Sequence, residues 1–169
     1  MAFTNQNKKQ IKNNTMKKIL AVVLIAFSLN GFAQQKEIEW YTDVNKAINI
    51  SVETGKPLFF FFTGSDWCGW CTQLKNAVFL KPEFTAWASK TVVLVELDFP
   101  RKTKLDPKIQ QQNNMLKKEM GVSGFPTVWF VTPEVTAGKI TLKKLDKLGT
   151  SRSVTAKIWI ENANKILKK

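Results

Sequence analysis

The sequence predicts an α/β domain in which a central mixed β-sheet is covered by helices on both of its faces. Two nearly continuous apolar segments, 58–62 and 91–98, have the length and composition of strands that are buried on both sides. Segments with the apolar spacing of helices lie between and after them, and this alternation favours βαβ crossovers with parallel pairing in part of the sheet. The chain has 169 residues, 44% of them apolar, which suffices for one packed core.

Each element expected in the first half of the domain follows from a local pattern. Apolar residues three and four positions apart define the helices, glycine and proline mark their ends, and unbroken apolar runs define the strands. In chain order, the elements are a helix capped by Thr42 or Asp43 and ended by Gly55, a strand at 58–62, a turn at 63–66, a helix from Cys68 through Val78, a helical piece beginning at Pro82, and a strand at 91–98.

The second half is expected to add a helix, a pair of strands and a last helix. These elements are a loop at 100–106, a helix at 107–120 stopped by Gly121, strands at 127–132 and 140–145, and a helix capped by Ser151 or Ser153. The short connection between the two strands favours an antiparallel hairpin. Open sheets of this kind place their sites at the carboxyl ends of the strands, and Cys68 falls there, just after the strand at 58–62.

The composition excludes several kinds of active site. The chain has no histidine and only two cysteines, which excludes serine–histidine and cysteine–histidine catalysis, histidine-ligated zinc and c-type haem attachment. Lysine and arginine outnumber the acidic residues by 26 to 13, which gives a net charge of +13. The basic residues are spread along the chain and do not form a dense patch with aromatic residues, so we expect no nucleic-acid partner.

Residues 1–33 have the features of a secretory signal. Lysines follow Met16, which is itself a candidate for the true start, and the run at 19–29 is apolar except for one serine. Gly31 and Ala33 supply small residues at the −3 and −1 positions, so cleavage is expected after Ala33. The run is too short for a membrane-spanning helix, and the alternative interpretation is an uncleaved anchor or a buried helix.

Cleavage leaves a short linker at 34–37 and a single domain at 38–169. The removed segment carries five lysines and no acidic residue, so the net charge falls from +13 to +8. We expect the mature protein to be periplasmic or secreted, to be monomeric and to have no stable membrane anchor.

Both cysteines lie in one motif, Trp67-Cys68-Gly69-Trp70-Cys71, between an expected strand and an expected helix. Two thiols three residues apart on a first helical turn can close a small disulfide and reopen it. Cys68 faces the unpaired N–H groups and the positive end of the helix dipole, which favour the thiolate and lower the pKa of its thiol below that of a free cysteine. Cys71 lies one turn further into the helix, where it is expected to be more buried and suits the role of a resolving thiol. Cys68 is therefore expected to be the exposed sulfur.

Other uses of the two cysteines compete with redox chemistry. A structural zinc site needs four ligands, and haem attachment needs a histidine where this chain has Thr72. A purely structural disulfide across so short a loop stabilises little. The alternatives that stay open are a non-catalytic Cu(I)-handling or binding module built on the same two thiols, and an inert pair. We expect no resident metal, and no cofactor besides the redox-active Cys68–Cys71 disulfide.

The segments 61–71 (FFTGSDWCGWC) and 121–127 (GVSGFPT) together resemble the thioredoxin superfamily. They resemble more closely the secreted thioredoxin-like proteins of bacterial envelopes, and the resemblance covers about residues 38–167. It implies a thioredoxin fold and a thiol:disulfide oxidoreductase that exchanges disulfides with envelope proteins and works with a membrane redox partner. The direction of electron flow cannot be read from the motif.

The resemblance also implies roles for individual residues. Cys68 is the nucleophile, Cys71 is the resolving thiol, and Pro126 is a cis-proline that faces the disulfide; an ordinary trans turn is the alternative for Pro126. The remaining residues expected to orient or bind an extended substrate chain are Trp67, Gly69, Trp70, Phe125 and Thr127. Core packing is the alternative for the three aromatic residues among them.

The sequence departs from the pattern of thioredoxin-like reductases near the motif. Those proteins bury an acidic residue in the strand before the motif, where this chain is wholly apolar; the candidates to replace it are Glu96, Asp98 and Glu119. Trp70 stands where a typical thioredoxin has proline, and this position tunes the redox potential. Asp66 either opposes the thiolate at Cys68 or serves only as a turn residue.

The signal interpretation predicts the mass of the mature protein. Protein extracted from the cell envelope should begin at Gln34, because the small residues at 31 and 33 form the cleavage site. Intact-mass measurement checks this directly, and a full-length product in the cytosol would contradict it.

Overall fold

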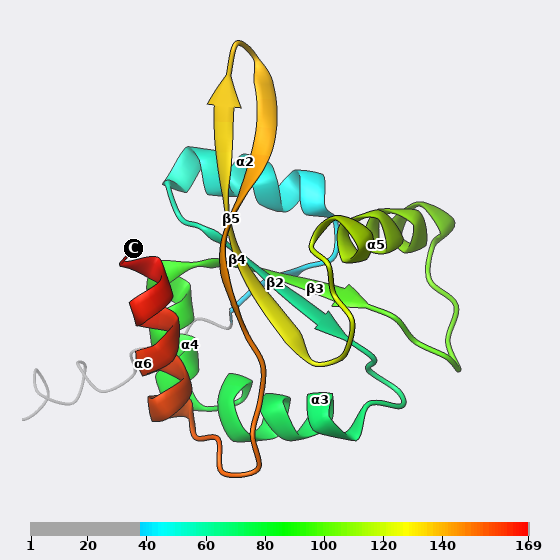
Figure 1. Ribbon diagram of the computed structural model, residues 1–169, viewed down its shortest axis with the longest axis vertical. Helices are drawn as coiled ribbons and strands as arrows, with labels where there is room; N and C mark the ends of the chain where they lie inside the picture. The colour runs from blue at the N-terminus through cyan, green and yellow to red at the C-terminus, as the bar shows by residue number, and fades with distance from the viewer. Residues whose placement is uncertain (1–37, 169) are drawn as a thin grey trace, which may run out of the picture. The chain divides into compact units, whose positions relative to one another are not determined.

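The computed structural model describes residues 38–168, so the expected signal region, its cleavage site and the linker lie outside the described residues. Within the described part, the elements follow one another as shown in Figure 1. They are β1 (Trp40–Tyr41), α2 (Val44–Thr54), β2 (Leu58–Thr63), α3 (Gly69–Leu74), the π-helical segment η1 (Lys75–Phe79), α4 (Pro82–Thr91), β3 (Val93–Asp98), α5 (Pro107–Glu119), β4 (Thr127–Thr136), β5 (Lys139–Leu148) and α6 (Ala156–Leu167).

The five strands form one mixed sheet, as the sequence predicts. Their order in the sheet is β1-β3-β2-β4-β5. β3 pairs in parallel with both β1 and β2, whereas β4 is antiparallel to β2 and to β5. The parallel pairing expected for part of the sheet is therefore confirmed, and the crossover between β2 and β3 provides one such pair. β4 does not continue it, because Thr127 begins beside Phe62 at the end of β2 and β4 runs back along that strand.

The sheet separates two apolar clusters, because successive side chains of a strand point to opposite faces. Phe59 and Phe61 of β2 pack with α3, η1, α4 and α6, whereas Phe60 and Phe62 pack with α2 and α5. Figure 1 shows the same division of the helices between the two faces. All six residues of β2 are buried, as expected for a central strand. The expected α/β sandwich with helices on both faces is thus present.

Several element boundaries confirm the local signals. The Asp43 carboxylate caps α2 by accepting a hydrogen bond from the Asn45 N–H at 2.9 Å, and Gly55 ends that helix with φ of 69°. Pro82 occupies the first turn of α4. The last helix differs from expectation: its cap is Thr155, whose hydroxyl accepts a hydrogen bond from the Ile158 N–H at 3.3 Å. Ser151 and Ser153 lie in the turn before it.

The hairpin of β4 and β5 is longer than the sequence predicts. Pro133 was expected in the connection, but the turn lies at Ala137 and Gly138, which both have positive φ. Pro133 is tolerated inside β4 because β2 pairs with β4 only as far as Val131. Beyond that residue β4 has a neighbouring strand on one side only, where a missing N–H costs little.

The helix that follows the motif is continuous but not uniform. α3 passes directly into η1, a π-helical segment that the apolar spacing did not indicate. The following strand β3 starts at Val93, because Thr91 still belongs to α4. Among residues 38–168, no helix has both the length and the apolar character needed to cross a bilayer.

Candidate active site

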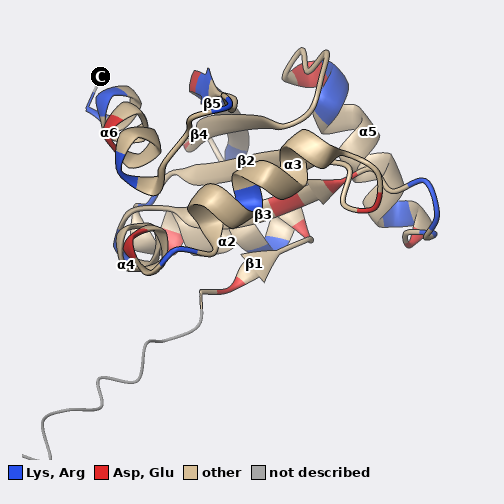
Figure 2. Cartoon of the chain, turned by 90° about the horizontal axis from the view of Figure 1, so that it is seen from below, with Lys and Arg blue, Asp and Glu red and all other residues tan. Residues whose placement is uncertain are grey.

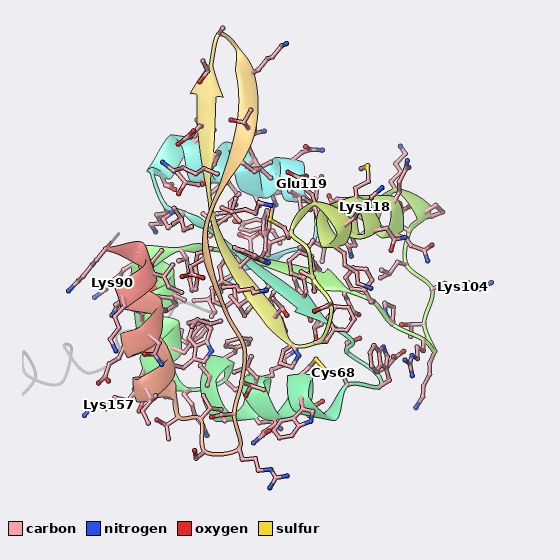
Figure 3. The ribbon with its side chains drawn as sticks, in the orientation of Figure 1. Cys68, Lys90, Lys104, Lys118, Glu119 and Lys157 are labelled. Carbon is pink, nitrogen blue, oxygen red and sulfur yellow. A yellow bond between two sulfur atoms is a disulfide. The ribbon has the colours of Figure 1, made fainter. Side chains whose placement is uncertain are left out.

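Cys68 and Cys71 lie beyond the carboxyl end of β2, where the chain turns into α3 (Figure 3). Their sulfur atoms form a disulfide, and their Cα atoms are 5.2 Å apart. Cys68 is the N-cap residue of α3, and its Sγ accepts a hydrogen bond from the backbone N–H of Cys71 at 3.2 Å. The same N–H also donates to the Cys68 carbonyl at 3.0 Å, so a backbone donor in the first turn of the helix is shared between that carbonyl and the sulfur of the expected nucleophile.

Cys68 and Cys71 are both buried in the disulfide form. Cys68 is 7% exposed and Cys71 is 3% exposed. The expectation of an exposed Cys68 is therefore wrong for this state. The reason is that Cys68 belongs to the same apolar cluster as Phe61 and Leu74, with Phe125 packed against that cluster. Access to Cys68 differs from access to Cys71 only slightly, so any difference in reactivity depends chiefly on the helix N-terminus.

Trp67 forms one side of the site. Its ring lies edge-on to Phe125, with centroids 5.8 Å apart, and its Nε1–H donates to the backbone carbonyl of Phe99 at 2.8 Å. The rings of Phe99 and Phe125 stack at 5.1 Å. Gly64 makes room for this arrangement, because a Cβ at that position would overlap the Trp67 indole. The residues immediately before Cys68 and Pro126 are thereby held in contact.

Asp66 anchors the loop that follows β3. Its carboxylate accepts hydrogen bonds from the backbone N–H groups of Arg101 at 3.0 Å, Lys102 at 2.7 Å and Thr103 at 3.3 Å. These bonds, that of Arg101 first, lower the pKa of Asp66 from its usual value. The carboxylate is directed to the loop, so Asp66 acts as a structural anchor here.

The three candidates for the missing buried acid occupy different environments. Asp98 accepts hydrogen bonds from the Ser65 N–H at 2.8 Å and the Ser65 hydroxyl at 2.5 Å, and so holds the turn before the motif. Glu119 is exposed at the end of α5. Glu96 pairs in register with Phe61 and shares the sheet face of Leu94, which is the face covered by α3. Burial raises the pKa of Glu96, although Lys75 opposes this shift.

The other residues predicted at the site lie at the start of α3 and at the turn before β4. Trp70 is 47% exposed, and Gly69 opens α3 on the surface. The Phe125–Pro126 peptide bond is cis. Thr127 begins β4, and its hydroxyl donates to the Gly124 carbonyl at 2.8 Å, which closes the turn before the proline.

Three residues at the site were not predicted from the sequence. Phe99 stacks on Phe125, the Arg101 guanidinium carbon lies 3.8 Å from the centre of the Trp67 ring, and the Lys117 Nζ lies 5.4 Å from that of Phe125. Phe99 and Arg101 follow the carboxyl end of β3, the strand beside β2, and that adjacency was an available signal. Lys117 had none, because its position depends on how α5 packs against the sheet.

Residues 44–148 match the family described as "Thioredoxin-like domain". Among characterised proteins, the "Disulfide bond reductase DsbH" of Chlamydia pneumoniae is 37% identical over 89 residues, which are 53% of this chain and 54% of that protein. The "Thioredoxin-related protein DsbJ" of the same organism is 30% identical over 133 residues, which are 75% of this chain and 38% of that protein. The chain thus spans about half the length of the first relative and less of the second.

Solved structures agree with the observed topology. A structure titled "DsbH Oxidoreductase" matches with a TM-score of 0.66 and 28% identity, covering 85% of this chain and 98% of that one. A thioredoxin from Thermus thermophilus matches with a TM-score of 0.56 at 18% identity over 77% of this chain and 87% of its own, which is a likeness of fold alone.

The contact between Gly64 and Trp67 predicts a specific sensitivity. Gly64→Ala should destabilise the domain by about 1–3 kcal/mol, because the added methyl group displaces an indole that is held by its bond to Phe99. Gly124→Ala is the matched control, since a Cβ there meets nothing within 4 Å, and its effect should stay below about 1 kcal/mol. Urea unfolding of both variants checks this; equal losses would contradict it.

Proposed function

The chain belongs to the thioredoxin-like family, and from this membership we propose that it is a thiol:disulfide oxidoreductase that reduces disulfides in proteins of the bacterial envelope. The observation that carries the proposal is the Cys68–Cys71 disulfide at the start of α3, with the Cys71 N–H directed at the Cys68 sulfur. The reducing direction is supported by the relative that is named a disulfide bond reductase.

The reaction proceeds through two exchanges of sulfur partners. In the reduced protein, the Cys68 thiolate attacks one sulfur of a substrate disulfide, the substrate S–S bond breaks, and one substrate thiolate leaves. Cys71 then loses its proton and attacks the Cys68 sulfur, which closes the Cys68–Cys71 bond and releases the second substrate thiolate. The departing thiolates take up two protons, one released by Cys71 and one from water, to which Cys68 gave its own proton on ionising. Counted from the dithiol, the substrate gains two electrons and two protons and the protein loses the same number.

The N-cap geometry of Cys68 favours the first exchange. The negative charge of a thiolate is stabilised by backbone N–H donors at a helix N-terminus, and Cys71 supplies such a donor at 3.2 Å. Cys71 lies inside the first turn of α3, and no N–H group of residues 38–168 donates to its sulfur as Cys71 does to Cys68. We therefore assign attack to Cys68 and resolution to Cys71.

An extended substrate chain binds between the motif and the turn that precedes β4. Pro126 has no N–H, so at that residue the turn has no backbone donor that would compete with an extended chain for hydrogen bonds. The rings of Trp67 and Phe125 form an apolar surface at this turn, and the exposed Trp70 offers a second apolar surface. Gly69 keeps the approach to the disulfide free of a side chain.

The location and the electron source follow from the same proposal. The signal-like residues 1–33 support export to the periplasm or the cell exterior. Each cycle leaves the Cys68–Cys71 pair oxidised, so a membrane dithiol partner must return two electrons to it.

The division of labour between the two thiols predicts opposite behaviour of two serine variants. Cys71→Ser keeps the attacking thiol and lacks the resolving one, so covalent complexes with envelope proteins should accumulate, at least about tenfold more than with Cys68→Ser. Non-reducing gels of envelope extracts followed by mass spectrometry measure this.

The double variant Cys68→Ser/Cys71→Ser is the control for contacts that do not involve sulfur. Equal trapping by the two single variants would contradict the assignment of roles. Absence of trapping by either variant, combined with tight stoichiometric binding of Cu(I) by the reduced protein, would replace the proposal by a copper-handling module.

A further inference from the structure

Two cations lie on the aromatic wall of the site. The wall consists of Trp67, Phe125 and Phe99. The ring of Phe125 contacts those of the other two, and the Trp67 indole donates to the Phe99 carbonyl. The Arg101 guanidinium covers the Trp67 ring at 3.8 Å, and the Lys117 ammonium lies 5.5 Å from the ring centre of Phe99 and 5.4 Å from that of Phe125. Arg101 is therefore held over the residue before Cys68, and Lys117 over the residue before Pro126.

Neither cation is neutralised by a carboxylate of the described chain. The ion pairs among residues 38–168 join Lys46 to Glu39 and Lys143 to Glu134, away from this wall. Asp66 and Asp98 remain charged near the wall, but their carboxylates accept the backbone N–H groups of the loop at 101–103 and of Ser65 and Phe99. Within the described residues, the charged groups of Arg101 and Lys117 thus form no ion pair and can contact a carboxylate of a bound chain.

The surrounding segments add to this positive charge. The loop at 99–106 between β3 and α5 carries Arg101, Lys102 and Lys104 and one acidic residue, Asp106, which caps α5. Figure 2 shows basic residues along this loop and on α5. A cation that rests on an aromatic face keeps its N–H donors free at the edges, so it can contact a carboxylate while the ring contacts apolar atoms of the same chain.

We infer that the substrates of this site are extended polypeptide segments that carry Asp or Glu next to the attacked cysteine, and that Arg101 and Lys117 select them. The inference rests on the proposed oxidoreductase function and names its substrate class. A segment lying along the wall would place one acidic side chain near Arg101, over Trp67, and another near Lys117, over Phe99 and Phe125. The same segment with lysine at those positions would meet like charges.

The arrangement differs from a general attraction of acidic molecules to a basic protein. A net charge acts at long range and does not depend on two particular residues, whereas contacts at the wall depend on Arg101 and Lys117. Lys90 on α4 and Lys157 on α6 carry the same charge on the far side of the domain from Cys68 (Figure 3). Removing either pair of cations changes the net charge equally.

The test uses three disulfide peptides that differ only in having Glu, Gln or Lys on either side of the attacked cysteine. Reduced protein is mixed with each peptide, dithiothreitol regenerates the dithiol, and kcat/KM is measured. The Glu peptide should exceed the Lys peptide by about threefold to tenfold near 0.1 M salt, and the ratio should approach one near 1 M salt, where screening is strong. The double variant Arg101→Gln/Lys117→Gln should lose most of the ratio, whereas Lys90→Gln/Lys157→Gln should keep it.

A second measurement separates substrate choice from chemistry. Serine analogues of the three peptides cannot exchange disulfides, and their binding to the oxidised protein is followed by tryptophan fluorescence. Tighter binding of the Glu analogue that depends on Arg101 and Lys117 supports the inference even if no peptide is reduced, in which case only the proposed reductase activity fails. Efficient reduction with equal rates for the Glu and Lys peptides overturns the inference and leaves the activity standing. Equal loss of the ratio in both double variants also overturns it, because net charge would then be the cause.

Discussion

The hydrogen bond from the Cys71 N–H to the Cys68 sulfur is the contact on which the chemistry of this domain depends. At most helix starts a hydroxyl or carboxylate accepts this N–H, and here a sulfur takes that place. The geometry requires a helix that begins one residue after Cys68 and a strand that ends a few residues before it. β2 supplies this position because all of its side chains are buried between two helical layers, which fixes where the turn at 64–67 emerges.

The turn and the loop after β3 form one unit around that contact. The carboxylates of Asp66 and Asp98 join the turn after β2 to the end of β3 and the loop that follows it. Asp66 accepts a hydrogen bond from the Lys102 N–H, and Asp98 accepts one from the Ser65 N–H. Trp67 adds the bond from its indole to Phe99, and Gly64 provides the space for the ring. The carboxylates at this edge thus accept backbone N–H groups, and within residues 38–168 Arg101 and Lys117 form no ion pair. The apolar wall and its positive charge are consequences of the same set of bonds that position the disulfide.

Local signals in the sequence predicted the parts of the fold that local physics determines. The continuous apolar run of β2, the Asp43 cap, the left-handed Gly55 and Pro82 in the first turn of α4 are each set by a few neighbouring residues. β1 has only two residues, too few for a periodic pattern, and the antiparallel direction of β4 depends on where α5 returns the chain. At the site, the motif identified the cysteines, whereas the contacts of Arg101 and Lys117 join segments far apart in sequence and need the packed structure.

In the proposed function, the Cys68–Cys71 pair is a reversible redox couple poised to donate electrons. A titration of the purified protein in thiol–disulfide buffers, followed by alkylation and intact-mass measurement, tests it most directly. We expect a single two-electron transition with a midpoint closer to about −270 mV, the value of thioredoxin, than to about −120 mV, the value of a strong oxidant. A disulfide that no buffer reduces, or a midpoint near the oxidant's value, would contradict it.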